Sequence, residues 1–595
     1  MHIQFFAVSL QSRFAELLSK PSEESLLFSE APPTKAQTES AEIAQLVEHD
    51  LAKVGVASSS LVFRSNTKGD AVDAPPFFVI KTNIRYICIR MKRTLSILLS
   101  SLLLVSCVDM FPPDNEEKKD TSGTSLTEYC VVVGDKEYYP VDTVGTKWVI
   151  PVPEGTKLTR LVARYKDNSA SVTVNGVEQE SGVTTNSFIN YKKGVVYRLT
   201  SQDGRTKDYT INVIDTRLPV VSVTTATPGA IKDRVTWRDA SIKIMNTDGT
   251  VADLGSTGIR GRGNWTWEKY PKKPYALKLG KKQQVLGMPA HKRWVLLALY
   301  RGFIGNALMF EATRRAPALE WAPRGEFVEL VLNGKFQGMY YLCEHIKIDK
   351  NRVNISELEP TDVNYPEVSG GYLLEYDELY DEDYKFMSSG FNLPVQLKSP
   401  DDNVPEAQFN YISDFINDME AELLKIGSSG GSRYGDYMDR DTFAEFWMVL
   451  ETVGNYEAYK PRSVKMYKGR DGVDSPSGTG CKLKAGPLWD QELFLVDKVF
   501  NSKDAHYFKY LFKDPDFVAT VKARWPAYKE NILGNDTYMG FVDYLNQMVS
   551  FIQTSANRDT ALWGNEYFTL SGEVNPVRRG FVSKINWMDS QINAF

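Results

Sequence analysis

The sequence predicts an α+β protein in which a small all-β domain precedes a larger mixed domain. Short β-branched runs separated by glycine, asparagine and aspartate fill residues 126–216, which is the pattern of strands joined by tight turns. Over residues 218–595, runs typical of strands alternate with longer amphipathic runs typical of helices. The composition, with 42% hydrophobic and 24% charged residues, is that of an ordinary globular protein.

The charge balance and the content of cysteine and histidine argue against several classes of protein. The net charge is −5, whereas a nucleic-acid-binding protein carries a basic face, so we expect no nucleic-acid partner. The five cysteines include no CxxC pair, so neither a zinc knuckle nor a disulfide framework is predicted. With five histidines and no HExxH motif, a histidine-dependent metalloprotease is not predicted either.

A lipoprotein signal is predicted at residues 91–106. Lys92 and Arg93 follow Met91, and the apolar stretch after them suits a signal peptide but is too short to cross a bilayer. The stretch ends in Leu-Val-Ser-Cys, which resembles the lipobox of bacterial lipoproteins, where cleavage occurs before the cysteine. Acyl chains on Cys107 would hold the protein to a membrane, so we expect a lipid-anchored protein of the bacterial cell envelope, on the outer membrane.

Such a signal functions only at an N-terminus, so residues 1–90 are expected to be an upstream extension from a misplaced gene start. One permitted back-translation of Ala44–Ser65 folds as a transfer-RNA gene, with paired GACC and GGTC segments and a GTTCGA loop. We therefore expect translation to begin at Met91, the mature chain to begin at Cys107, and residues 1–90 to be disordered.

Two segments separate the predicted lipid from the large domain. Residues 107–125 are polar, with a proline pair and mixed charges, which predicts a flexible tether. The strand spacing over residues 126–216 predicts a small β-sandwich, and its end, Ser201–Val213, resembles the last hairpin of Ig-like or cadherin-like surface modules. No carboxylate cluster lies there, so we interpret this domain as a spacer.

The first of four blocks that carry chemistry is Gly258–Leu279, a glycine-rich turn followed by basic residues. Backbone N–H groups of such a turn can approach phosphates, and arginine and lysine neutralise them. Gly261 and Gly263 complete only half of a GxGxxG motif, so a basic turn facing solvent is the alternative for this block alone. Its candidate side chains are Arg260, Arg262, Asn264, Lys272, Lys273 and Lys278.

The second block, Glu326–Ile355, predicts two strands joined by a hairpin at Asn333-Gly334. Glu344 follows an apolar run on the second strand. It could meet a phosphate-binding lysine, as kinases require, or lie exposed at the strand end.

The third block, Glu451–Lys468, places Asn455 and Glu457 just after a predicted helix. Amide and carboxylate oxygens are ligands that suit Mg²⁺, a hard cation. This block therefore offers candidate metal ligands.

The fourth block, Lys482–Leu495, contains Asp490 and Glu492, which on a strand would face the same side. Two carboxylates on one face repel each other unless a cation lies between them. We therefore favour metal chelation over a polar strand face in contact with solvent.

Together, the Arg-Gly-Asn turn with its Pro-Lys-Lys-Pro-Tyr run, the two-strand signature, the Asn and acidic pair, and the Gly-Pro-x-Trp-Asp segment resemble the CotH kinase family over residues 218–595. The resemblance implies an atypical protein-kinase-like domain that transfers phosphate from ATP, with Mg²⁺, to Ser, Thr or Tyr of an envelope protein. It implies catalytic roles for Asp490, Lys278 and Glu344, nucleotide contacts from Arg260, Arg262, Asn264, Lys272 and Lys273, and Mg²⁺ ligation by Asp490, Asn455, Glu457 and Glu492.

The sequence departs from the family pattern at several positions. Glu457 and Glu492 stand where the family carries Asp, an acidic residue is missing at Arg301 or Gly302, and Gly305 stands where Arg is usual. A catalytically weak or inactive surface lipoprotein, acting as a binding or structural module, is therefore the alternative function. A glycosidase fits less well, because its two carboxylates flank a sugar from opposite sides, whereas those of the fourth block are expected on one face.

Overall fold

The computed structural model describes residues 119–476 and 479–595, which belong to one compact unit. The predicted upstream extension, the signal peptide and the lipidated Cys107 lie outside the described residues. Within the two described ranges, no helix combines the length and the apolar sequence that spanning a membrane requires.

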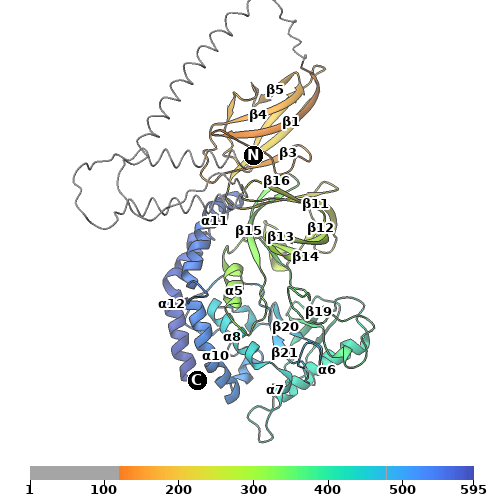
Figure 1. Ribbon diagram of the computed structural model, residues 1–595, viewed down its shortest axis with the longest axis vertical. Helices are drawn as coiled ribbons and strands as arrows, with labels where there is room; N and C mark the ends of the chain where they lie inside the picture. Colours follow the sequence, from red (N-terminus) through yellow and green to blue (C-terminus); the bar gives the residue numbers. More distant parts are fainter. Residues whose placement is uncertain (1–118, 477–478) are drawn as a thin grey trace, which may run out of the picture. The chain divides into compact units, whose positions relative to one another are not determined.

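The first strands form two sheets around one shared apolar core (Figure 1). They are β1 (Ser122–Val133), β2 (Lys136–Tyr138), β3 (Lys147–Val152), β4 (Leu161–Ser169), β5 (Ser171–Val174), β6 (Val177–Glu178), β7 (Thr185–Asn186), β8 (Val195–Thr200) and β9 (Thr206–Asp215). The sheet orders are β2-β1-β4-β7 and β3-β9-β8-β5-β6. In the core, the Tyr129 ring stacks on that of Tyr165 at a centroid distance of 5.9 Å. Because β1 begins at Ser122, the prediction of a tether up to residue 125 is wrong over its last four residues.

Seven further strands close into a barrel. They are β10 (Val220–Thr225), β11 (Arg238–Met245), β12 (Val251–Gly261), β13 (Tyr275–Val285), β14 (Met288–Leu297), β15 (Gly325–Leu332) and β16 (Lys335–Glu344). The order around the barrel is β10-β11-β12-β13-β14-β16-β15, and the parallel pairing of β10 with β15 closes it. Alternate apolar side chains fill the interior: Leu277 and Leu279 are each 1% exposed, whereas Lys278 between them faces solvent.

The remaining strands form a five-stranded sheet of order β18-β19-β17-β20-β21, made of β17 (Tyr372–Tyr376), β18 (Lys385–Met387), β19 (Pro394–Ser399), β20 (Val464–Lys468) and β21 (Leu483–Ala485). The helices are α4 (Trp265–Lys269), α5 (Gly305–Arg314), α6 (Glu406–Leu423), α7 (Tyr434–Tyr437), α8 (Arg440–Val453), α9 (Phe508–Leu511), α10 (Pro515–Leu533), α11 (Phe541–Trp563) and α12 (Leu570–Ala594), with 3₁₀ turns at Glu367–Ser369 and Glu457–Tyr459. The largest apolar core joins this sheet to α5, α6, α8 and the C-terminal helices (Figure 1). The mixture of helices and sheets confirms the predicted α+β class.

The central helix α8 sets the position of the third sequence block. The Asp439 side chain accepts a hydrogen bond from the Thr442 N–H at 3.0 Å and caps its first turn. All residues from Thr442 to Val453 are buried. The helix ends at Gly454, whose φ of +69° is the left-handed conformation that favours glycine at a helix end. The chain therefore leaves the core abruptly and presents the next residues at one end of α8.

Candidate functional site

Three segments that are far apart in sequence converge at the candidate site. They are the turn after β12, which carries Arg262, the turn after α8, which carries Glu457, and the chain after β21, which carries Asp490 and Glu492. Their charges interact: the carboxylates of Asp490 and Glu492 help to raise the pKa of Glu457, and Arg262 opposes the rise in the pKa of Asp490. All four residues are partly exposed, so the site keeps access to solvent.

A turn, and not the predicted strand, presents Asp490. β21 ends at Ala485, and residues 486–500 contain no strand. Asp490 has a φ of +70°, in the left-handed region that residues other than glycine rarely adopt. Its neighbours Trp489 and Gln491 are only 9% and 3% exposed and anchor the turn on both sides. The argument from strand alternation is therefore wrong, although the fourth block does bring two carboxylates to one site.

Gln491, between the two acids, fixes this turn. Its side-chain oxygen accepts a hydrogen bond from Asn455 Nδ2 at 2.7 Å, and its backbone N–H donates to Asn306 Oδ1 at 3.1 Å. Asn455 Oδ1 also accepts a bond from the Ala458 N–H at 3.0 Å. These two bonds give Asn455 a role in positioning the turn; its oxygen accepts only one of them, and its ligation of Mg²⁺ stays a prediction. Gln491 and Asn306 were not predicted, since only their positions, between the two acids and in the first turn of α5, mark them in the sequence.

The segment from Gly302 to Gly305, which leads into α5, packs directly against the backbone of Glu492. A Cβ atom would lie 2.0 Å from the Glu492 carbonyl oxygen at Gly302, and 2.5 Å from it at Gly305. Glu573 on α12 holds the same segment by accepting hydrogen bonds from two of its backbone N–H groups, at 2.7 and 3.2 Å. No side chain fits at either glycine, so the chain here requires glycine both at Gly302, where an acidic residue was expected at this or the preceding position, and at Gly305, where Arg was expected.

Glu492 has two polar partners. The Tyr270 hydroxyl donates a hydrogen bond to its carboxylate at 3.1 Å, and Arg301 Nη1 lies 3.8 Å from the same oxygen. Burial and the charge of Asp490 nevertheless raise the pKa of Glu492 to about 7. Arg301, which the sequence marks as a departure from the family pattern, therefore belongs to the site as a partner of Glu492.

The pKa values of the three carboxyl groups, those of Glu457, Asp490 and Glu492, are all raised. Burial, together with the charges of Asp490 and Glu492, raises the pKa of Glu457 to about 7, and burial raises the pKa of Asp490 as well. A bound cation would relieve this repulsion. Among the residues that the structure describes, no group of three or more His, Cys, Asp or Glu side chains, these three carboxyls included, is arranged to hold a metal ion. Mg²⁺ needs only one or two carboxylates and completes its shell with water or phosphate oxygens, so a pair such as Asp490 and Glu492 stays the predicted ligand set.

Arg262 supplies a positive charge beside Asp490. Its guanidinium lies over the Trp489 ring, 5.5 Å from the ring centroid, and faces Asp490 electrostatically. Within residues 119–476 and 479–595, its side chain forms no ion pair or hydrogen bond. Arg262 therefore remains available to an anion at this site.

A second source of positive charge, which sequence analysis missed, lies on the adjoining sheet. Lys465 on β20 is 7% exposed and forms an ion pair with Glu375 on β17. Lys398 contacts the other carboxylate oxygen of Glu375 at 3.3 Å. Lys465 also opposes the rise in the pKa of Asp490. In the sequence, only its position within the third block marks it. The sequence does not reveal that both faces of its strand are buried.

The predicted pairing of Lys278 with Glu344 is wrong. Glu344 is fully buried and accepts hydrogen bonds from Arg324 Nε and Nη2 at 3.0 and 3.1 Å. Arg352 Nε lies 3.9 Å from its other side. Lys278 projects from the outer face of the barrel into solvent. The Glu344 carboxylate is thus a structural partner of two arginines.

Lys272 is also structural. It is 0% exposed, and its Nζ donates hydrogen bonds to Asp559 Oδ1 at 2.6 Å and to the Met339 carbonyl at 2.5 Å. The same ammonium lies 4.7 Å from the centroid of the Tyr340 ring. Its predicted contact with a nucleotide is therefore wrong, because no surface of Lys272 is left for a ligand.

Two other predicted phosphate contacts are engaged by neighbouring side chains. The Arg260 guanidinium lies over the Trp237 ring at 4.7 Å from the centroid. Asn264 accepts a hydrogen bond from Arg234 through its side-chain oxygen. The contact with Arg234 leaves Asn264 with a structural role, whereas Arg260 Nε has no hydrogen-bond partner among the described residues, so its predicted phosphate contact stays a prediction.

Trp267 fills the space inside the glycine-rich turn. A Cβ atom at Gly261 would lie 2.5 Å from the Trp267 ring, so this glycine makes room for an indole. Lys273 donates a hydrogen bond to the Trp267 carbonyl and lies over its ring at 5.6 Å. The turn is therefore packed by protein, and the prediction that its glycines and Lys273 cradle a phosphate is wrong.

Comparison with known proteins gives a family. Residues 259–578 match the family model described as CotH kinase protein. No curated protein matches the chain. A crystal structure from Bacteroides thetaiotaomicron, described provisionally as a glycoside hydrolase, is 15% identical, with 30% of this chain and 53% of that chain covered and a TM-score of 0.16. A likeness of this size carries no argument about fold or function.

Proposed function

This chain belongs to the CotH kinase protein family, and from that membership we propose that it transfers the terminal phosphoryl group of ATP to a Ser, Thr or Tyr hydroxyl of an envelope protein. The observation that carries the proposal is the group formed by Glu457, Asp490 and Glu492, with Arg262 beside Asp490. Catalysis of phosphoryl transfer consists largely of positioning and charge neutralisation. A group of acids that favours a bound cation, next to a free guanidinium, suits that task.

Two sets of residues would hold the nucleotide. Asp490 and Glu492 would ligate Mg²⁺, which when bound neutralises the phosphates of ATP. Arg262 would neutralise the transferring phosphoryl group, since its guanidinium matches phosphate geometry and has no other ion-pair partner within the described residues. Lys465 lies behind this group and would add positive charge without direct contact.

The proposed reaction is an in-line displacement at phosphorus. The acceptor hydroxyl oxygen bonds to the γ-phosphorus, the bond from that phosphorus to the bridging oxygen breaks, and ADP departs. The hydroxyl proton passes to a carboxylate, which we assign to Glu457. Its pKa of about 7 suits proton transfer near neutral pH, and within the described residues its side chain forms no hydrogen bond or ion pair.

The envelope location of the acceptor rests on the predicted signal at residues 91–106. We propose that the mature chain begins at Cys107 and carries acyl chains there, which would place the domain outside the cytoplasm. The spacer role and the β-sandwich interpretation of the first two sheets, and the kinase-like interpretation of residues 218–595, belong to the same proposal. Mass spectrometry of the mature N-terminal peptide tests it, and an unmodified Cys107 would contradict it.

Thermal unfolding with ATP and Mg²⁺ tests the nucleotide site. A ligand that binds only the folded protein raises its midpoint, so we expect a rise with ATP and Mg²⁺ that a chelator removes. Labelled ATP should then pass its γ-phosphate to an envelope protein. If millimolar ATP with Mg²⁺ gives no rise, the chain keeps the family's fold without the nucleotide site, and the alternative of a binding module is favoured.

The effect of Mg²⁺ should depend on pH. Folding raises the pKa values of Glu457 and Glu492 from 4.5 to about 7, so without metal their contribution to stability is present below the unfolded pKa and is lost as the pH rises through 7. Mg²⁺ binds the ionised forms, so its stabilising effect should be larger at about pH 8 than at about pH 6. Glu457→Gln should reduce this pH dependence, and an equal effect of Mg²⁺ at both pH values in the unaltered protein would contradict the assignment.

A further inference from the structure

Two cations lie directly opposite each other on the outer face of the barrel. Lys278 on β13 pairs in register with Arg293 on β14, and on its other side with Gly258 on β12, which offers no side chain. Lys278 is exposed and Arg293 is partly exposed, so both side chains point away from the barrel interior. Like charges directly opposite each other on neighbouring strands destabilise a sheet. This face of the sheet therefore favours a compensating negative charge.

A third cation, Arg260 on β12, joins them at one indole ring. The guanidiniums of Arg260 and Arg293 lie 4.7 and 5.1 Å from the centroid of the Trp237 ring. That ring packs over Gly258, where a Cβ atom would lie 3.0 Å from it. Burial and the charge of Arg293 lower the pKa of Arg260. The indole thus holds near each other two guanidiniums that repel.

We call Arg260, Lys278 and Arg293 the basic patch. Within the described ranges none of the three forms an ion pair, and the Arg293 guanidinium donates no hydrogen bond and has no buried nitrogen. Arg260 Nε is buried, and Nη1 donates one long bond to the Val235 carbonyl at 3.4 Å, whereas Nη2 keeps contact with solvent. A ligand can therefore reach Lys278, the Arg293 guanidinium and one edge of Arg260.

The acids whose charges act on the two arginines of the basic patch already have partners. They are Asp401, Glu382 and Asp233. Asp401 pairs with a lysine at 2.8 Å, and Glu382 pairs with another lysine. Asp233 accepts hydrogen bonds from two backbone N–H groups at 2.9 and 2.6 Å. The basic patch therefore keeps a net positive charge.

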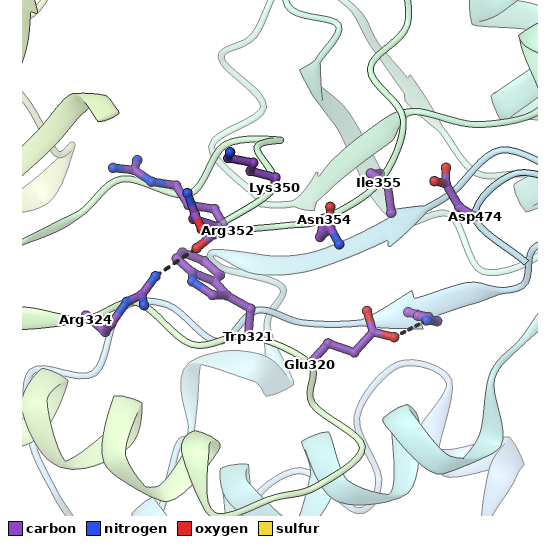
Figure 2. A pocket seen from close by; sticks show the side chains of 10 residues that line it. Glu320, Trp321, Arg324, Lys350, Arg352, Asn354, Ile355 and Asp474 are labelled. Atoms are coloured by element: carbon purple, nitrogen blue, oxygen red, sulfur yellow. Dashed lines mark hydrogen bonds and ion pairs between the residues drawn. The ribbon is translucent and has the colours of Figure 1, made fainter. Parts of the chain in front are cut away.

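Cations at a polar pocket elsewhere on the domain show the contrasting arrangement. Figure 2 shows Glu320 on the wall of that pocket, where it pairs with Lys484. Arg324, on the same wall, lies 3.0 Å from the Glu344 carboxylate. Among the described residues, no acid takes up such a position beside the basic patch. A surface that concentrates one sign of charge in this way attracts a ligand of the opposite sign.

The basic patch adjoins the candidate site. Arg262 follows Arg260 by two residues, and its N–H bonds across to the Pro274 carbonyl at 3.2 Å, beside the last paired residues of β12 and β13. Side chains two residues apart on extended backbone share a face. At about 3.3 Å per residue, Arg260 lies about 7 Å from Arg262, and the row of Lys278 and Arg293 lies about 13 Å away. An extended peptide covers these distances with about two to four residues.

We propose that the basic patch binds an oxyanion of the acceptor protein, a carboxylate or phosphorylated side chain about two to four residues from the hydroxyl that receives the phosphoryl group. This inference rests on the proposed phosphoryl transfer and names its acceptor as an acidic or already phosphorylated segment. Arginine matches carboxylate and phosphate oxygens in a bidentate manner, and arginine clusters recognise acidic and phosphorylated motifs. A phosphate carries nearly two charges at neutral pH, so it neutralises more of the basic patch than a carboxylate does.

Labelled peptides and the full chain test the proposal. The peptides have a central Ser, Thr or Tyr in a background of Ala and Gly, and the residues three positions before and after it are both phosphoserine, both Glu or both Lys. Fluorescence anisotropy at about 50 mM salt, where screening is weak, should show the tightest binding for phosphoserine and the weakest for Lys. Arg293→Gln and Lys278→Gln should each weaken binding of the anionic peptides roughly 3- to 10-fold. Lys335→Gln, at an exposed lysine that begins β16, should leave it unchanged.

The outcomes distinguish this inference from the proposed function. Anionic peptides that bind no tighter than the Lys peptides, or that bind both patch variants as well as the unaltered protein, overturn the inference. It is overturned equally if Arg262→Gln abolishes the binding and Arg293→Gln does not, because the anion then occupies the candidate site.

Labelled ATP with Mg²⁺ completes the test. Equal incorporation of the γ-phosphate into all the peptides contradicts the inference and leaves the proposed function in place. Binding that depends on Lys278 and Arg293, without incorporation into any peptide, supports the basic patch as an anion site and contradicts the proposed function.

Discussion

Asp490→Asn is expected to lower the rate of phosphoryl transfer by about 10²- to 10³-fold, the size of effect seen when one charge-stabilising group is removed from an active site. The side chain keeps its shape, but the metal loses an anionic ligand and Arg262 loses the charge it faces. Transfer of the γ-phosphate of labelled ATP measures the effect. The metal-dependent rise in the unfolding midpoint should disappear with it.

The choice of Asn over Ala follows from the backbone. Asp490 has a φ of +70°, a conformation that Asn tolerates better than Ala does. Asp490→Ala should also abolish transfer, but it adds backbone strain of roughly 1–2 kcal/mol, which the Asn variant avoids. Asp504→Ala is the matched control, because that residue is exposed and has no partner within the described residues. Full turnover by Asp490→Asn would remove this carboxylate from the proposed site.

Local sequence patterns predicted the individual elements of the fold but not how the barrel closes. The hairpin between β15 and β16 was predicted from Asn333-Gly334, and both residues adopt positive φ, +52° and +69°, as such a turn requires. The pairing that closes the barrel joins β10 to β15 in parallel, with Val221 beside Leu330. No local signal links two strands so far apart, because the closing contact depends on the tilt and register of every strand between them.

At the candidate site, the sequence predicted which acids matter but not how they are held. Asp490 and Glu492 were chosen from the fourth block and Glu457 from the third, and the charges of the first two act on the pKa of Glu457. The geometry was predicted wrongly, because a spacing of two residues fits a strand and a tight turn equally well. The turn is held by hydrogen bonds that join Gln491 to Asn306 on α5 and to Asn455 in the turn after α8. Contacts of this kind cannot be predicted from the local spacing of the acids.

Lysines were the least predictable part of the site. A run of basic residues after a glycine-rich turn is the same in sequence whether the side chains face a phosphate, solvent or a buried acid. Lys278 faces solvent and Lys272 meets Asp559, which is 287 residues away. Only tertiary contacts distinguish these environments, so charge patterns predict a binding face poorly unless the partner lies nearby in sequence.

Lys272→Ala is expected to lower the free energy of unfolding by about 3–5 kcal/mol, because it removes one member of a buried ion pair and leaves the other uncompensated. The side chains of Lys272 and Asp559 are 0% and 4% exposed. Burial already raises the pKa of Asp559 to about 6 despite the adjacent ammonium. Without Lys272 that pKa should rise further, so the loss of stability should be larger at about pH 8 than at about pH 5. Chemical denaturation at the two pH values measures both effects.

Lys278→Ala is the matched control, since both lysines belong to the same block but Lys278 faces solvent. Its effect on the free energy of unfolding should stay within about 0.5 kcal/mol. The double variant Lys272→Met with Asp559→Leu should recover part of the lost stability, because it removes the unpaired charge that makes the single variant costly. A Lys272→Ala protein that keeps its stability but no longer responds to ATP would instead return this lysine to the nucleotide site. Stability and nucleotide response thus separate a lysine that supports the barrel from one that binds phosphate.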